Sequence, residues 1–381
     1  MRLFGQLVGA AIMICTLADI FLTILYARVG RGRAKRLGAG LISLAIAQGV
    51  WAAFRRLPLK DGPKQETLSF AGPLILVLLL VTWTLCLTLG DALLLWPALG
   101  DSVRSSSGPT PTGFPAAVYA AATSLSITGS SDFIPHTNGY RMIYLVGSFI
   151  GTAVVTLTLS YLLQLYGALQ RQNTLGQQLF FLTRETGDAV ELIRGLAVGQ
   201  HPETAYSMLA DAAQSLSSVH ESLRIYPITF FFRYPEPHFS LAAISFMALE
   251  TVSLLRACLR DDAPDLLKHG GAVELLWRAA LSTLDTLDGA YVRSGRRIRR
   301  ADADLDDDTR AAWAEHYGRA AEKLRGAGLK QLIDDGGADE YVRQRAVWNG
   351  LVMSIAQYSA VDLDNLGASS EQSTRERRLR S

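Results

Sequence analysis

The sequence predicts an all-α membrane protein, in which transmembrane helices and a re-entrant loop precede an all-α cytosolic domain. Three observations lead to this fold class. The long apolar runs fall within residues 1–170, whereas most acidic residues lie within residues 171–381. One apolar segment between two of these runs is too short to cross a bilayer. Beyond residue 171, few segments alternate with the period of two that is typical of strands.

Three stretches contain the roughly 20 apolar residues that a helix needs to cross the hydrocarbon core. The first has only Arg2 before it and no small-residue cleavage site after it, so we interpret it as a retained span and not as a signal peptide. Ala34–Leu57 is less apolar and has basic flanks, which is typical of a helix lying along the headgroups, although a fourth span is an alternative. The predicted spans are Leu3–Ala27, Phe70–Trp96 and Tyr140–Leu165.

The distribution of basic residues predicts the orientation of these spans. Lysines and arginines cluster between the first two spans, whereas the loop Pro97–Phe114 contains a single arginine. Because cytoplasmic loops are enriched in lysine and arginine, the linker is expected in the cytoplasm and the amino terminus outside. The third span then returns the chain, so Arg171 and the residues after it are expected to be cytoplasmic.

Composition gives no indication of catalysis or of a nucleic-acid partner. The formal net charge is only +2, and Cys15, Cys86 and Cys258 are scattered without the spacing of a metal site. No nucleophile–base pair or metal cluster can be assembled from the sequence. We therefore expect no enzyme, no catalytic residues and no cofactor.

The segment Phe114–Phe133, FPAAVYAAATSLSITGSSDF, carries the most specific pattern. Pro115–Leu125 is predicted to be a short helix with proline at its start, and it is long enough for about half the bilayer at 1.5 Å per residue. A run of hydroxyl and glycine residues follows it. Non-helical backbone at membrane depth is tolerated only where protein buries it or water lines it. The pattern predicts a re-entrant pore loop at Thr123–Asp132, with a plain extracellular turn as the alternative.

Ser124–Asp132, SLSITGSSD, resembles the pore loop of the potassium-channel superfamily, whose pattern is T-L-T-T-V-G-Y-G-D. It keeps the leucine, the first glycine and the aspartate, and Phe133–Pro135 is similar to that family's extracellular exit. The resemblance covers about Thr67–Tyr166 and implies an outer helix, a pore loop and an inner helix. Together with the N-terminal span, the run Asp19–Thr23 is similar to bacterial two-transmembrane-pore channels. This similarity implies the plasma (inner) membrane of a prokaryote.

The departures from the family pattern bear on selectivity. In the family, backbone carbonyls of T-V-G-Y-G replace the hydration shell of potassium. Here Ser130 stands at the aromatic position and Ser131 at the second glycine, where a side chain resists a left-handed backbone. We expect a wider, partly hydrated filter with Asp132 as an acidic ring that concentrates cations at its mouth. The predicted filter residues are Ser126, Ile127, Thr128, Gly129, Ser130, Ser131 and Asp132.

The resemblance also implies the assembly and its activity. A central pore of this family needs four loops and the chain contains one, so a homotetramer is expected. The expected activity is weakly selective conduction of monovalent cations, K⁺ and/or Na⁺, with no other metal. Strict potassium selectivity is an alternative, as is a non-conducting scaffold or sensor that retains the channel fold.

Several other residues of the membrane half are candidates for function. Asp19 lies inside the first span, and is interpreted either as a partner for a basic residue or sensing element, or as a structural hydrogen-bonding group. Asp91 is expected to be solvated near the outer end of its span. The resemblance places a gating hinge at Gly151. Gly147 and Gly151 also form a G-x-x-x-G pattern, which is interpreted as a close-packing face, a hinge or both, with packing favoured for Gly147. An inner-mouth constriction, or else simple helix packing, is predicted at Leu157, Tyr161 and Leu165.

The remainder of the chain is predicted to be a helical domain that gates or assembles the pore and binds a cytosolic ligand or protein of unknown identity. Its expected helices are Gln177–Ala197, Glu203–Arg224, Phe239–Arg260, Ala263–Arg293, Asp307–Ala327 and Asp339–Asp362. The predicted segments are 1–33 (first span), 34–66 (basic interfacial helix), 67–171 (pore domain), 172–366 (cytosolic helical domain) and 367–381 (disordered tail).

Overall fold

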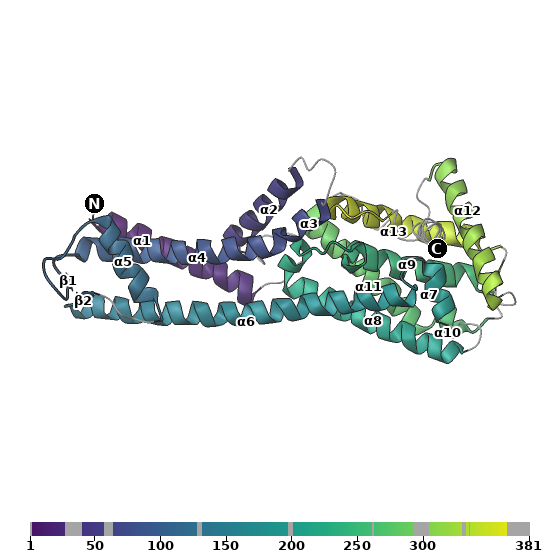
Figure 1. The fold of residues 1–381 in the computed structure, drawn as a ribbon, viewed down its shortest axis with the longest axis horizontal. Coiled ribbons are helices and arrows are strands. Elements are labelled where there is room, and N and C mark those ends of the chain that lie inside the picture. Colours follow the sequence, from purple (N-terminus) through teal and green to yellow (C-terminus); the bar gives the residue numbers. More distant parts are fainter. Residues whose placement is uncertain are drawn as a thin grey trace, which may run out of the picture. The chain divides into compact units, whose positions relative to one another are not determined.

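The computed structural model divides the chain into two compact units, Met1–Gly167 and Ala168–Ser381. It describes residues 2–26, 40–56, 64–127, 132–196, 201–260, 263–292, 305–329, 333–334 and 336–363. The filter positions Thr128–Ser131 and the predicted tail 367–381 lie outside the described residues. Each unit is helical, which confirms the all-α prediction (Figure 1).

The first unit contains the three predicted spans as helices. Their apolar stretches cover Leu3–Leu25, Glu66–Ala98 and the first part of Asn138–Leu182, and each is long enough to cross a membrane. Its elements are α1 (Arg2–Ile20) with a π turn at Phe21–Leu25, α2 (Leu41–Arg56), α3 (Lys64–Ser69), α4 (Ala71–Leu95), β1 (Val103–Ser105), α5 (Phe114–Leu125), β2 (Phe133–Pro135) and α6 (Asn138–Leu182), which continues into the second unit.

Small residues bring the helices of the first unit close together. α1 and α4 lie side by side, and a Cβ added to Gly90 would come within 2.9 Å of the carbonyl oxygen of Gly9. α5 packs on the end of α4 through Ala117, Ala120 and Ala121, which are fully buried. Small side chains allow such close approach between apolar helices, where packing and not water exclusion holds them together in a bilayer.

A short antiparallel ladder, absent from the sequence predictions, joins the two ends of the loop region. Val103 pairs with Pro135 and Ser105 with Phe133, so β1 follows α4 and β2 directly precedes α6. The backbone N–H of His136 also donates to Ser102 O at 2.8 Å. These hydrogen bonds hold the return of the chain after α5 at the same end of the unit as the start of α6 (Figure 1).

The second unit is a bundle around α9 (Leu241–Cys258), which contacts α7, α11, α12 and α13. By length and composition α9 could cross a membrane, but 89% of its apolar stretch is buried by the protein itself. A helix that is apolar all round belongs either in a bilayer or in a core. The other helices are α7 (Ala189–Gly195), α8 (Pro202–Ile225), α10 (Asp265–Lys268), α11 (Gly271–Leu287), α12 (Asp307–Leu324) and α13 (Ala338–Ser359).

The predicted helix Gln177–Ala197 is wrong as a single element, because a turn separates α6 from α7. Arg184 and Gly187 have φ values of 52° and 70°, which a helix cannot contain. Asp188 then begins α7, since its side chain accepts from the backbone N–H of Val190 at 2.9 Å.

The predicted helix Ala263–Arg293 is also interrupted, between α10 and α11. The extended Gly270 packs so closely on the carbonyl of Leu266 that a Cβ there would overlap it, and Tyr206 of α8 lies against the same point. The extended backbone at Gly270 therefore separates α10 from α11, and only glycine fits in this turn against Leu266 and Tyr206.

A buried carboxylate connects three helices of the second unit. Glu250 of α9 is 3% exposed, and its Oε1 accepts from Tyr341 Oη of α13 and lies 3.0 Å from His316 Nε2 of α12. Arg345 Nη1 lies 3.4 Å from the same oxygen. Burial by itself raises the pKa of Glu250, but Arg345 and the hydrogen bonds from His316 and Tyr341 outweigh it and lower the pKa below its ordinary value of 4.5.

We predict that Glu250→Gln lowers the free energy of unfolding by about 3–5 kcal/mol at pH 7, because it leaves the Arg345 charge buried without its partner. The lowered pKa means that the Glu250 carboxylate stabilises the fold above pH 4.5 and that this contribution is lost as the pH falls below that value. Thermal unfolding of the full-length protein between pH 7 and pH 3.5 measures both effects. The control is Glu315→Gln, an exposed member of an ion pair on α12. Equal losses in the two variants would contradict the prediction.

Candidate functional site

The candidate site is centred on the C-terminal end of α5, at Leu125. Pro115 occupies the first turn of this 12-residue helix, where its missing N–H leaves no intrahelical bond unmade. The other end of α5 lies against α6, because a Cβ added to Gly151 would overlap the carbonyl oxygen of Leu125. Gly151 is about 20 Å along α6 from Asn138 at 1.5 Å per residue. The C-terminal end of α5 therefore lies beside α6 at that distance from the start of α6.

The structure shows a packing role for Gly151, which was one of the two roles that the G-x-x-x-G spacing allowed. Any side chain at this position would collide with the backbone of Leu125, so glycine is required for the contact between α5 and α6. Leu125, Ile150 and Val154 continue this contact toward Trp83 of α4. The gating hinge at Gly151 stays a prediction, because it concerns movement of α6.

The predicted filter residues that the structure describes precede Thr128 or follow Ser131. Ile127 is 65% exposed after the end of α5, and Asp132 is exposed just before β2. Tyr119 of α5 donates to Asp132 Oδ2 at 3.4 Å and its ring packs edge-on against Phe133. Asp132 is thus held beside Tyr119 near the middle of α5, just before the start of β2 and α6.

The predicted inner-mouth residues differ in burial within the chain. Leu157 is half-buried, whereas Tyr161 is 5% exposed and Leu165 is fully buried. A side chain that lines a path between subunits remains open in a single chain. The burial of Tyr161 and Leu165 therefore favours helix packing, the alternative to a constriction.

α6 carries a hydroxyl stripe, defined as Thr152, Thr156 and Ser160, which the sequence analysis missed. All three residues are exposed, and they recur every four residues along one side of the helix. Only 11% of the apolar stretch of α6 is buried by the rest of the chain, whereas 33% is buried in α1 and 39% in α4. The signal was present in the sequence as a four-residue spacing of hydroxyl groups within an apolar run.

Asp19, in contrast, is fully engaged by neighbouring helices. Its Oδ1 accepts from the backbone N–H of Ile42 at 2.9 Å, at the first turn of α2. Its Oδ2 accepts from Ser43 Oγ at 2.6 Å and from Trp83 Nε1 of α4 at 2.9 Å. A carboxylate at a helix N-terminus satisfies free N–H groups and interacts favourably with the helix dipole. In the structure, Asp19 therefore joins α1, α2 and α4.

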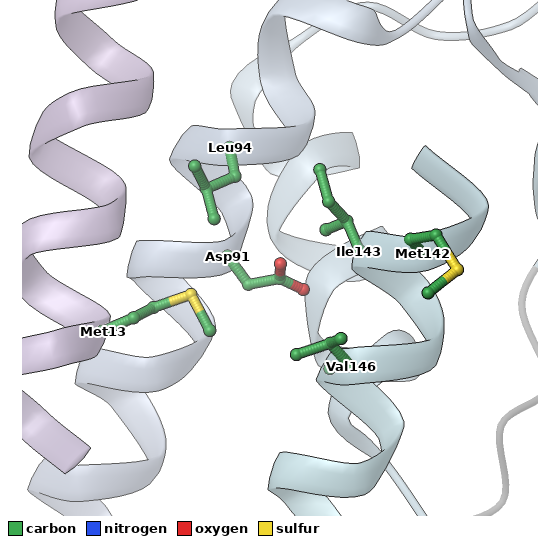
Figure 2. A pocket seen from close by; sticks show the side chains of 7 residues that line it. Met13, Asp91, Leu94, Met142, Ile143 and Val146 are labelled. Carbon is green, nitrogen blue, oxygen red and sulfur yellow. The ribbon is translucent and has the colours of Figure 1, made fainter. Parts of the chain in front are cut away.

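Asp91 was expected to be solvated, and this prediction is wrong. The residue is 1% exposed, and among the described residues neither carboxylate oxygen has a hydrogen-bond partner. Its side chain points into a pocket of about 240 Å³ between α1, α4 and α6 (Figure 2). The prediction rested on the position of Asp91 near the end of α4, where water is expected to be close. The sequence does not show that α1 and α6 pack over this position. The pocket is lined by Met13, Asp91, Leu94, Met142, Ile143, Val146 and Gly147.

Comparison with known proteins identifies a relative that is described as a membrane protein. An uncharacterized membrane protein of Bacillus subtilis, YdjJ, is 21% identical over 233 residues, which is 61% of this chain. The match spans 63% of the length of that protein. No family model matches the chain, and no solved structure matches it significantly. Taken with the three exposed apolar helices of the first unit, the similarity decides the class. The chain is an all-α membrane protein.

Within this membrane protein, the described residues contain no group of three or more histidine, cysteine or acidic side chains that could hold a metal ion. Its chemistry in the first unit is instead that of hydroxyl groups, backbone carbonyls and two buried carboxylates.

We predict that Gly151→Ala destabilises the membrane protein, because the added methyl group collides with the Leu125 carbonyl. Overpacking of this kind costs about 1–3 kcal/mol. The matched control is Gly139→Ala on the same helix, where nothing lies within 4 Å of the new Cβ and helix propensity favours alanine. Thermal unfolding in detergent should show a lower midpoint only for the first variant. A midpoint unchanged by Gly151→Ala would contradict the close contact.

We predict opposite effects from removing the charge of the two buried aspartates. Asp19→Ala leaves Ser43 and Trp83 without their acceptor, at a cost of about 1–3 kcal/mol for each buried group. Asp91→Asn removes a charge that makes no hydrogen bond to any described residue, so the protein should be as stable or more stable. Thermal unfolding of both variants in one detergent measures the difference. A loss of stability in both would show that Asp91 has a partner.

Proposed function

We propose that the protein is a homotetrameric channel for monovalent cations, in which each subunit contributes one re-entrant loop. The position of α5 carries this proposal. The 12-residue helix α5 begins near the β1–β2 ladder and ends against Gly151 of α6. By Asp132, which directly precedes β2, the chain is back at the end of the unit where the ladder lies. A segment that enters to partial depth and comes back on the same side does not cross the bilayer. Such backbone needs water or protein around it.

The direction of α5 supports a path for cations. The C-terminal end of a helix presents carbonyl oxygens without intrahelical partners and carries a partial negative charge. This end of α5 lies against Gly151 of α6, and Asp132 is exposed. In the proposed channel, we place the end of α5 at membrane depth and the carboxylate of Asp132 at the mouth of the pore. Four subunits would surround the path with these negative groups, which raise the local concentration of cations without distinguishing K⁺ from Na⁺.

The exposed face of α6 supports assembly. Its hydroxyl stripe is not covered by the chain's own helices, although apolar side chains such as Phe149 and Leu163 are also open. In a tetramer, four α6 helices can turn the hydroxyl groups toward a shared aqueous path and the apolar groups toward lipid or neighbouring subunits. The filter sequence I-T-G-S-S-D, in place of T-V-G-Y-G-D, favours weak selectivity.

The surroundings of the channel are part of the proposal. The basic linker between the first two spans favours an orientation with the amino terminus outside and the second unit in the cytoplasm. We place it in the plasma (inner) membrane of a prokaryote, where the second unit gates or assembles the pore in response to a cytosolic ligand or protein.

The proposal predicts currents from the purified protein in planar bilayers with potassium chloride on one side and sodium chloride on the other. A weakly selective pore gives a reversal potential near zero. A strong shift toward the potassium equilibrium potential would overturn weak selectivity. Absence of current over a range of voltage and pH would favour the non-conducting scaffold or sensor.

Asp132→Asn should lower the single-channel conductance, because it removes the acidic ring at the mouth. The loss should be largest in dilute salt and shrink toward 1 M, where the Debye length falls to about 3 Å. The matched control is Asp101→Asn, another exposed aspartate in the loop region of the same unit. Equal conductance in the two variants at low salt would remove the role of Asp132.

A further inference from the structure

The Asp91 pocket combines a buried charge with an otherwise apolar lining. It lies within the first unit, and Met13 of α1 faces Ile143 of α6 across the Asp91 carboxylate (Figure 2). Gly147 leaves the space open, since a Cβ there would lie 3.9 Å from Asp91 Oδ2 and 2.9 Å from Ser124 Oγ of α5. The Ser124 hydroxyl is also buried and has no partner among the described residues.

The chemistry of the lining restricts what the pocket can hold. An ionised carboxylate without a partner in apolar surroundings carries a large desolvation penalty, which a cation bound against it relieves. Calcium and magnesium need about six or more oxygen ligands, whereas the lining side chains supply only the two oxygens of Asp91. The remaining surface is hydrocarbon and thioether. A ligand with one positive charge and an apolar body complements both the Asp91 carboxylate and the apolar lining.

The size and position of the pocket set the size of that ligand. A cavity of about 150 Å³ is sufficient to hold benzene, so the 240 Å³ here accommodates a ring and a short ammonium arm. Met142 and Val146 are 57% and 49% exposed, so they form a rim open to the outside of the unit. An amphipathic amine can reach the pocket through this rim from the membrane.

We propose that the Asp91 pocket is a binding site for a small organic cation, with an ammonium group on Asp91 and an apolar body against Met13, Leu94 and Ile143. The site is separate from the proposed ion pathway. At about 3.6 residues per turn, Gly147 and Thr156 lie on opposite sides of α6. The bound cation would contact α1, α4 and α6 behind α5, and its binding requires no conduction.

Benzylammonium and its uncharged analogue benzyl alcohol test the proposal on the purified full-length protein in detergent. At ten times its dissociation constant, a ligand specific for the folded state should raise the unfolding midpoint by about 3–6 °C. We expect this shift from benzylammonium and a smaller one from benzyl alcohol. Isothermal titration should show that Asp91→Asn weakens benzylammonium binding by at least about tenfold.

Two further variants separate charge from shape. Asp101→Asn removes an exposed aspartate and should leave binding unchanged. Val146→Phe fills the rim from a half-exposed position, keeps the carboxylate and should abolish binding of benzylammonium. Equal binding of the two ligands, unaffected by Asp91→Asn, would overturn the proposal in favour of a plain apolar pocket. An Asp91-dependent shift from Na⁺ or K⁺ alone, with none from benzylammonium, would overturn it in favour of a metal-ion site, and no shift from any ligand would also overturn it.

Discussion

The contact between the Leu125 carbonyl and Gly151 is the constraint on which the arrangement of the first unit depends. It sets the position along α6 at which α5 ends, because no other residue at 151 allows the two backbones to approach so closely. The alanines of α5 pack against the end of α4. With α5 held at both ends, the ladder of β1 and β2 returns the chain to the start of α6. The proposed loop is therefore positioned by backbone contacts and small residues.

The two buried aspartates show how the same side chain takes different roles in apolar surroundings. Asp19 receives three hydrogen bonds and stabilises the junction of α1, α2 and α4. Asp91 receives none from the described residues and faces a pocket of 240 Å³. Burial of a charge is costly in both places. Hydrogen bonds offset that cost at Asp19, and at Asp91 it favours binding of a cation.

The second unit reaches its stability differently, through one apolar helix enclosed by others. α9 has the composition of a membrane span, yet the side chains around it are those of a protein core. Glu250 on this helix meets Tyr341 and Arg345 of α13 and His316 of α12, so a polar contact fixes how the neighbouring helices sit against it. Hydropathy alone cannot distinguish an apolar helix surrounded by lipid from one surrounded by protein.

The sequence by itself determined the position of the three apolar helices of the first unit, because 20 consecutive apolar residues have few other conformations available in a bilayer. It also located the short helix α5, since Pro115 and the hydroxyl run mark its two ends. Tertiary structure alone decided that Asp91 is buried, that Asp19 is bonded and that turns interrupt two long helices. Those outcomes depend on contacts between residues far apart in the chain, such as Trp83 with Asp19 and Tyr206 with Gly270. Local periodicity carries no information about such contacts, whereas the length and polarity of a segment are local properties and do predict an apolar helix, in lipid or in a protein core.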